Sequence, residues 1–169
     1  MSSQYTGSFD IEYIEVKGVT VIVPSEKEIA KQIKSLRDLE ARQTDSGVAK
    51  AMGERTDLYE SKLRDNRAKY AKKIKKKTFK FRQYSQMDRL EAQMAARVEW
   101  KEDEQPKVDM SLLDLHILSA CTGESVDSLK NENHVIYDVI HAEVFSRNQV
   151  TLDQLDFFDT LDTTSESDT

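Results

Sequence analysis

The sequence predicts a mainly α-helical protein: a small helical domain with an N-terminal β-hairpin and one short additional strand. Three observations favour this fold class. Only 5 Gly and 2 Pro occur among 169 residues, which leaves few sharp turns. Several stretches repeat apolar residues at helical spacing. Hydrophobic residues make up 38% and charged residues 33% of the chain. Average globular proteins have about 45–50% hydrophobic and about 25% charged residues. The core is therefore small for the length of the chain, and much helix surface faces solvent.

The β-hairpin is predicted within residues 1–24. Two arms of β-branched and aromatic residues flank Lys17-Gly18, and Gly tolerates the positive φ that a hairpin turn needs. The arms contain Phe9, Ile11, Tyr13, Ile14, Val19, Val21 and Val23. Because an isolated hairpin is only marginally stable in water, we expect this one to dock on another element.

Residues 25–77 are predicted to form a charged helical segment. Ser25 and Glu28 have the spacing of a capping box, which starts the first helix. Its apolar stripe consists of Ile29, Ile33, Leu36 and Leu39. Gly53 interrupts the pattern, so the second helix is predicted to begin near residues 56–57. That helix is largely polar, and we expect it to pair with the first helix, or with another copy, as a short coiled coil.

Residues 78–148 are predicted to form a compact unit of one strand and several helices. Thr78–Arg82 alternates apolar and basic residues, as a strand with one buried face does. Side chains suited to N-caps precede the helices, namely Ser85, Asp109, Ser125 and either Asn131 or Asn133. The first of these helices is expected to end near Trp100. Its apolar stripe consists of Met87, Leu90, Met94 and Val98.

The last part of the chain, residues 149–169, is predicted to be an acidic tail. It has two parts. Residues 150–158 contain the apolar side chains Val150, Leu152, Leu155, Phe157 and Phe158, and we expect them to pack or dock. Residues 160–169 are rich in Ser, Thr and Asp, which favours disorder.

Within residues 78–148 the predicted elements follow a recognisable order. After the strand and its helix comes an apolar helix that ends in the letters LSACTGES, from Leu118 to Ser125. A short helix and an Asx-capped helix that ends near Phe145 follow. This order resembles the tail assembly chaperones of tailed bacteriophages. The resemblance implies a protein that binds the tape-measure protein, or another long helical tail protein, and keeps it soluble before the tail tube polymerises. It implies no catalytic motif and no cofactor.

The two apolar stripes, on the helices that begin at Ser25 and Ser85, are the predicted partner-binding surfaces. Amphipathic faces of this kind accept a helical segment of another protein. They also leave self-association open as an alternative. Methionines in the second stripe suit adaptable packing because the Met side chain is flexible and polarisable.

Charge is unevenly distributed around a net charge of −6. Residues 69–82 contain no acid, and residues 151–169 contain no base. The candidate contacts to nucleic acid or to an acidic partner are Lys72, Lys73, Lys75, Lys76, Lys77, Lys80 and Arg82. We favour instead a solvated helix end that passes into a strand, because the whole chain is negative. A nucleic-acid-binding accessory protein, and a structural virion or coiled-coil component, remain alternative hypotheses.

Residues suited to catalysis or metal binding are few. The chain has three histidines and one cysteine, Cys121, which lies in an apolar helix stripe where cysteine is usually a small core residue. No Gly-rich phosphate loop and no G-x-S-x-G motif occurs. The sequence therefore predicts no enzyme, no metal site and no cofactor. The lone cysteine, with no signal peptide and no apolar run of about 18 residues, favours the cytoplasm, that of the host cell if the protein is viral.

Overall fold

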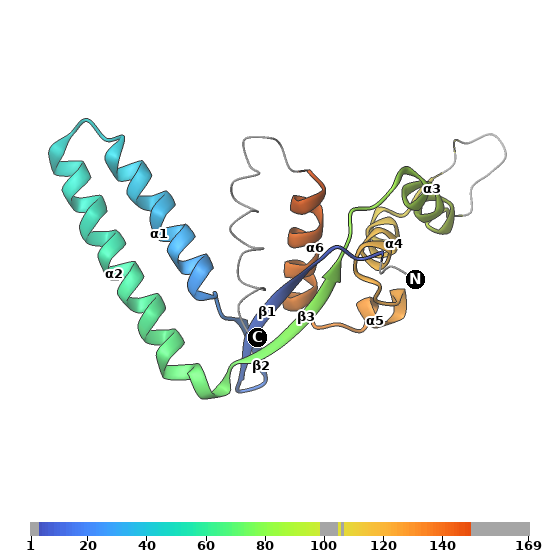
Figure 1. Cartoon of the computed structure of the whole chain (residues 1–169), viewed down its shortest axis with the longest axis horizontal. Coiled ribbons are helices and arrows are strands. Elements are labelled where there is room, and N and C mark those ends of the chain that lie inside the picture. The colour runs from blue at the N-terminus through green and yellow to red at the C-terminus, as the bar shows by residue number, and fades with distance from the viewer. Residues whose placement is uncertain (1–3, 99–104, 106, 150–169) are drawn as a thin grey trace. The chain divides into compact units, whose positions relative to one another are not determined.

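The computed structural model describes residues 4–98, 105 and 107–149. Its elements, in chain order, are β1 (Gly7–Val16), β2 (Val19–Ile22), α1 (Glu26–Ala41), α2 (Ser46–Tyr70), the 3-10 turn η1 (Ala71–Lys73), β3 (Lys75–Phe81), α3 (Gln86–Ala95), α4 (Met110–Thr122), α5 (Val126–Lys130) and α6 (His134–Asn148) (Figure 1). The fold is mainly helical, with one antiparallel sheet in the order β2-β1-β3. The predicted fold class is confirmed.

The chain divides into two compact units. The hairpin unit is Asp10–Thr78, and the bundle unit joins residues 1–9 to residues 79–169. The sequence had placed residues 1–24 in a segment of their own. The structure groups the start of β1 with the later helices because β1 is longer than one hairpin arm. Its first residues meet the end of β3, where the Phe9 and Phe79 rings stack with centroids 5.5 Å apart.

The β1–β2 hairpin turns at Lys17-Gly18, as predicted. Both residues have positive φ, 52° and 77°, the combination that a type I′ turn requires. The register pairs Ile14 with Val21 and Val16 with Val19. β3 begins at Lys75, before the predicted start at Thr78, so part of the lysine run is strand rather than helix end.

α2 begins at Ser46, well before the predicted start near residues 56–57. Asp45 caps it, and its Oδ1 accepts hydrogen bonds from the backbone N–H groups of Gly47 and Val48 at 2.8 and 3.0 Å. Gly53 does not break the helix. A Cβ atom there would lie 2.7 Å from Glu40 Oε1, so the glycine leaves room for the Glu40 carboxylate of α1. The prediction was wrong because it took a packing glycine for a breaker.

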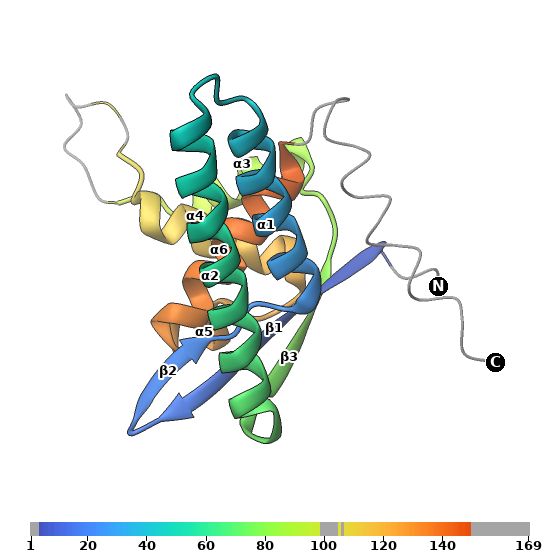
Figure 2. The same ribbon diagram turned by 90° about the vertical axis from the view of Figure 1, so that its left-hand side faces the viewer.

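α1 and α2 lie side by side and antiparallel within the hairpin unit (Figure 2). The Tyr59 hydroxyl donates a hydrogen bond to Gln32 Oε1 at 3.1 Å. The Arg37 guanidinium pairs with Asp57 and donates to the Gly53 carbonyl at 3.4 Å. The second helix therefore pairs with the first, one of the two arrangements that the sequence left open.

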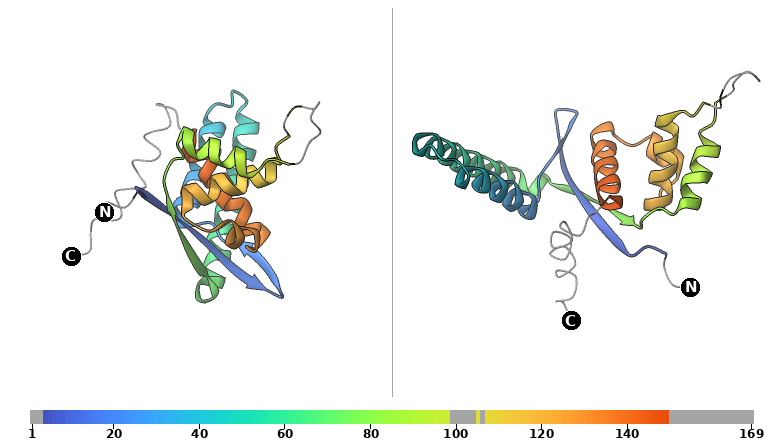
Figure 3. Two further views of the ribbon diagram at one scale, coloured as in Figure 1. Left: turned by 90° about the vertical axis from the view of Figure 1, so that its right-hand side faces the viewer. Right: turned by 90° about the horizontal axis from the view of Figure 1, so that it is seen from above.

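In the bundle unit, α4 lies between α3 and α6 (Figure 3). Ser85, Asp109, Ser125 and Asn133 each accept a backbone N–H at a helix start, as the sequence predicts. Gly123 follows α4 with a φ of 76°. α3 ends at Ala95 rather than near Trp100, which lies outside the described residues. The predicted tail segments 150–158 and 160–169 also lie outside them.

Candidate protein-binding site

α3 packs on α4 through its small side chains. Ala92 and Ala96 are 3% and 0% exposed, and residues four apart share one helix face. Asp88 lies four residues before Ala92, on the same face. Alanines here let the two helix backbones approach closely, because no long side chain separates them.

The opposite face of α3 presents its large apolar residues to solvent. Met87, Leu90, Met94 and Val98 are 63%, 45%, 65% and 39% exposed. We call these four residues the α3 face. The first three lie on α3, and Val98 follows it, where its backbone N–H donates to the Lys107 carbonyl at 3.1 Å. Amphipathic helices usually turn such a stripe towards the core, so α3 is inverted relative to the usual arrangement. Met110, also exposed, begins α4 beside the end of α3, where the Asp109 N–H donates to the Ala96 carbonyl at 2.9 Å.

Hydrogen bonds at the start of α3 fix this orientation. The two carboxylate oxygens of Asp88 accept from the guanidinium of Arg82 at 2.7 and 2.9 Å. Both side chains are less than one-fifth exposed. The Asp88 carboxylate also accepts from the backbone N–H of Ser85 at 2.6 Å, which completes the capping box. The hydrogen bonds from Arg82 hold the pKa of Asp88 well below its usual range.

Arg82 is in turn tied to α4. Its backbone N–H donates to the carbonyl of Cys121 at 2.9 Å. The Cys121 side chain is fully buried, and burial raises the pKa of its thiol. Rotation of α3 about its own axis would carry Asp88 away from Arg82, so the ion pair opposes any rotation that would bury the α3 face.

The α3 face is suited to holding an apolar helix. Full burial of a Leu or Met side chain contributes about 1.5–3 kcal/mol. The four side chains are roughly half exposed, so each has about 1 kcal/mol still to gain when a partner covers it. Methionine adapts to partners of different shape because it has three rotatable bonds.

The predicted stripe on α1 lies differently. Ile29 is fully buried and Ile33 is nearly so, which leaves neither side chain accessible to a partner in this conformation. Leu36 is half-buried, and Leu39, near the end of the helix, is exposed. Of the two predicted surfaces, only the one on α3 is open along its length.

The basic run does not form one surface of uncompensated cations. Lys75 pairs with Glu15 at 2.8 Å and Lys76 with Asp10 at 3.6 Å. Arg82 is taken up by Asp88. Lys77 and Lys80 lie over tyrosine rings at 5.9 and 5.7 Å. Lys72 and Lys73 lie in η1 and are exposed.

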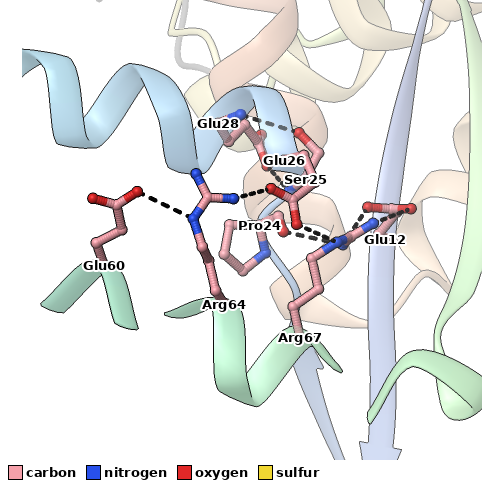
Figure 4. A network of polar contacts seen from close by, with 8 residues as sticks. All are labelled: Glu12, Pro24, Ser25, Glu26, Glu28, Glu60, Arg64 and Arg67. Carbon is pink, nitrogen blue, oxygen red and sulfur yellow. Dashed lines mark hydrogen bonds and ion pairs between the residues drawn. The ribbon is translucent and has the colours of Figure 1, made fainter. Parts of the chain in front are cut away.

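Sequence reasoning missed an ion-pair network at the base of the α1–α2 hairpin (Figure 4). Arg67 donates to Glu12 on β1 at 2.8 and 3.3 Å and to the Pro24 carbonyl at 3.1 Å. Arg64 donates to Glu60 at 3.1 Å and also pairs with Glu26. These contacts join the two helices to the sheet. Apart from the Arg64–Glu60 pair, they link residues distant in sequence, so periodicity offers no signal for them.

A histidine–carboxylate pair lies in the bundle unit. His141 Nε2 lies 2.9 Å from Asp114 Oδ2, with no third ligand. Across residues 4–98, 105 and 107–149, no three His, Cys, Asp or Glu side chains are grouped so that they could hold a metal ion. None of the helices in that part of the chain has the length and apolar run needed to cross a membrane.

Comparisons with known proteins do not identify a family. No family model, no curated protein and no solved structure matches the chain. The geometry of the α3 face is therefore the basis for a functional proposal.

Proposed function

We propose that the protein binds an apolar helical segment of another protein on the α3 face and catalyses no reaction. Its role would be that of a bacteriophage tail assembly chaperone, which holds the tape-measure protein soluble in the host cytoplasm before the tail tube polymerises. The observation that carries the proposal is the exposure of all four side chains of the α3 face. A helical partner would meet them with anchors at i, i+3, i+4 and i+7.

Single exposed apolar residues are normal on protein surfaces. The α3 face differs because Met87, Leu90 and Met94 share one side of one helix, with Val98 just beyond its end, while small residues pack the other side. Contiguous apolar surface of this kind marks interaction sites in monomeric proteins. A net charge of −6 supports solubility while such a face stays open.

A nucleic-acid-binding role for the basic run has less support. Such a role needs several cations that can neutralise phosphates. Three of the seven predicted cations, Lys75, Lys76 and Arg82, already pair with carboxylates. A structural virion component would use the same α3 face as a chaperone, and its presence in purified particles would distinguish it.

The proposal is tested by affinity capture from the native host at high salt with nuclease, followed by mass spectrometry. The double substitution Leu90→Asp and Met94→Asp should reduce capture of a long helical protein at least tenfold, because two anchors are lost and two charges must be desolvated. Leu58→Asp is the matched control, since Leu58 is a 58% exposed leucine on α2. Undiminished capture by the double variant, or a partner released by salt or nuclease, would contradict the proposal.

A further inference from the structure

The C-terminus of α6 lies beside the start of α3 in the bundle unit. The backbone N–H of Tyr84 donates to Asn148 Oδ1 at 3.1 Å. The Gln83 side chain donates to the carbonyl of Arg147 at 3.3 Å. Ser85, the N-cap of α3, follows directly. The chain beyond Gln149 therefore leaves the described structure within a few residues of Met87, the first member of the α3 face.

The segment that follows has the chemistry of an occupant for this face. Its apolar side chains are Val150, Leu152, Leu155, Phe157, Phe158 and Leu161. Its acids between residues 150 and 162 are Asp153, Asp156, Asp159 and Asp162, and no base accompanies them. Large apolar residues gain free energy when they leave water, so the segment has reason to find an apolar surface.

Length favours α3 as that surface. Glu91 is exposed on the α3 face, four residues after Met87 and three before Met94, so apolar contact rather than charge would hold an acidic segment there. As a ten-residue helix, α3 is about 15 Å long. Residues 150–158 span about 14 Å as a helix and about 30 Å when extended. Either conformation reaches along the α3 face from the exit point.

We infer that residues 150–162 dock on the α3 face of their own chain and compete with the partner for it. The inference rests on the proposed function in that both use this face, but it does not depend on which protein the partner is. Attachment beside the site gives the segment an effective concentration in the millimolar range. A segment with an intrinsic dissociation constant of about 0.1 mM would then weaken partner binding about tenfold.

The test compares methionine oxidation by hydrogen peroxide in the full chain and in a chain that ends at Gln149. Met87 and Met94 should oxidise several-fold more slowly than Met110 in the full chain, and at a similar rate to Met110 in the shortened chain. Met110 is a suitable reference because its exposure, 63%, matches theirs but it lies outside the α3 face.

Two full-length variants identify which tail residues provide the protection. Leu155→Ser with Phe158→Ser keeps every acid and should behave like the shortened chain. Glu166→Gln with Asp168→Asn changes charges beyond the docking segment and should leave the protection in place. Loss of protection in the second variant but not in the first would overturn the inference, because bulk charge rather than apolar docking would then be responsible.

Two further results would overturn the inference. Equal oxidation of Met87, Met94 and Met110 in the full chain would mean that the α3 face is bare. Protection that survives truncation and increases with protein concentration would mean that a second copy covers it. Partner capture by the shortened chain separates the two proposals. If the shortened chain captures a partner but Met87 and Met94 are not protected in the full chain, the proposed function stands and the inference fails. If they are protected but no partner is captured, the inference stands and the proposed function fails.

Discussion

Replacing Asp88 by Asn tests whether the Arg82–Asp88 ion pair holds α3 in its inverted orientation. The carboxylate accepts two hydrogen bonds from Arg82 and one from the Ser85 backbone. An Asn amide has only one acceptor atom, and its NH₂ group would face the donors of the guanidinium. A hydrogen bond to a charged group contributes about 1.5–3 kcal/mol, and the Arg82 charge would lose its partner. We therefore expect a loss of about 2–3 kcal/mol in the stability of the bundle unit.

Cys121 provides the assay because it is the only cysteine and is fully buried in α4. A thiol reagent reaches it only when the bundle unit opens, so the labelling rate reports the free energy of opening. A loss of 2–3 kcal/mol raises that rate roughly 30- to 140-fold, since about 1.4 kcal/mol corresponds to a factor of ten. Asp109→Asn is the control. Asp109 also caps a helix, Asn caps helices equally well, and labelling should stay near the wild-type rate.

The same ion pair predicts a pH dependence. Because the pKa of Asp88 is depressed in the folded state, its contribution is fully present above the ordinary Asp pKa of about 3.9. It is lost as the pH falls below that value towards the folded-state pKa. Urea denaturation should show the gap between wild type and Asp88→Asn narrowing below about pH 4. Wild-type labelling rates in the variant at neutral pH would refute the role assigned to the pair.

Two glycine substitutions give further predictions. Gly53→Ala should change stability by less than about 0.5 kcal/mol, because a helix-propensity gain of about 1 kcal/mol is offset by displacing Glu40. In a Glu40→Ala background, Gly53→Ala should show the full helix-propensity gain in stability. A double-mutant cycle measured by urea denaturation that finds no coupling between the two substitutions would contradict this. Gly123→Ala should cost more than Gly18→Ala. Both glycines have positive φ, so an alanine at either position costs about 1–2 kcal/mol in backbone conformation. Only at Gly123 would the new Cβ also meet a neighbour, Tyr5 Oη at 2.5 Å. Equal shifts in thermal denaturation would argue against that contact.

The parts of the fold that were predicted correctly depend on local signals. Turn residues such as Lys17-Gly18 and caps such as Ser25 and Ser85 act within a few residues of themselves, so a single sequence displays them. The start of α2 was missed because Gly53 serves a contact with a residue on another helix. A pattern along the chain does not distinguish a glycine that ends a helix from one that admits a neighbour. The early start of β3 was missed for a related reason, since Lys75 pairs with Glu15 on β1.

For the candidate site, the sequence predicted both apolar stripes but not which of them is exposed. Apolar spacing alone makes the stripes on α1 and α3 equivalent, yet the α1 stripe is buried at Ile29 and Ile33, whereas the α3 face is exposed along its length. The difference lies on their opposite faces. In α1 that face carries charged residues, among them Lys27, Lys31, Lys34 and Asp38, so only the stripe can enter the core. In α3 it carries Asp88, Ala92 and Ala96, which can pack closely and pair with Arg82.

This contrast also explains how the α3 face stays open without a partner. Rotating α3 by half a turn would offer its large side chains about 1 kcal/mol each through burial. The rotation would break the Arg82–Asp88 pair and place methionine and leucine where only alanine fits, which forces α3 away from α4 and costs packing there. The close alanine contact and the ion pair thus act together against the rotated state. A partner, or the chain's own C-terminal segment, can gain the burial energy of the α3 face without either cost.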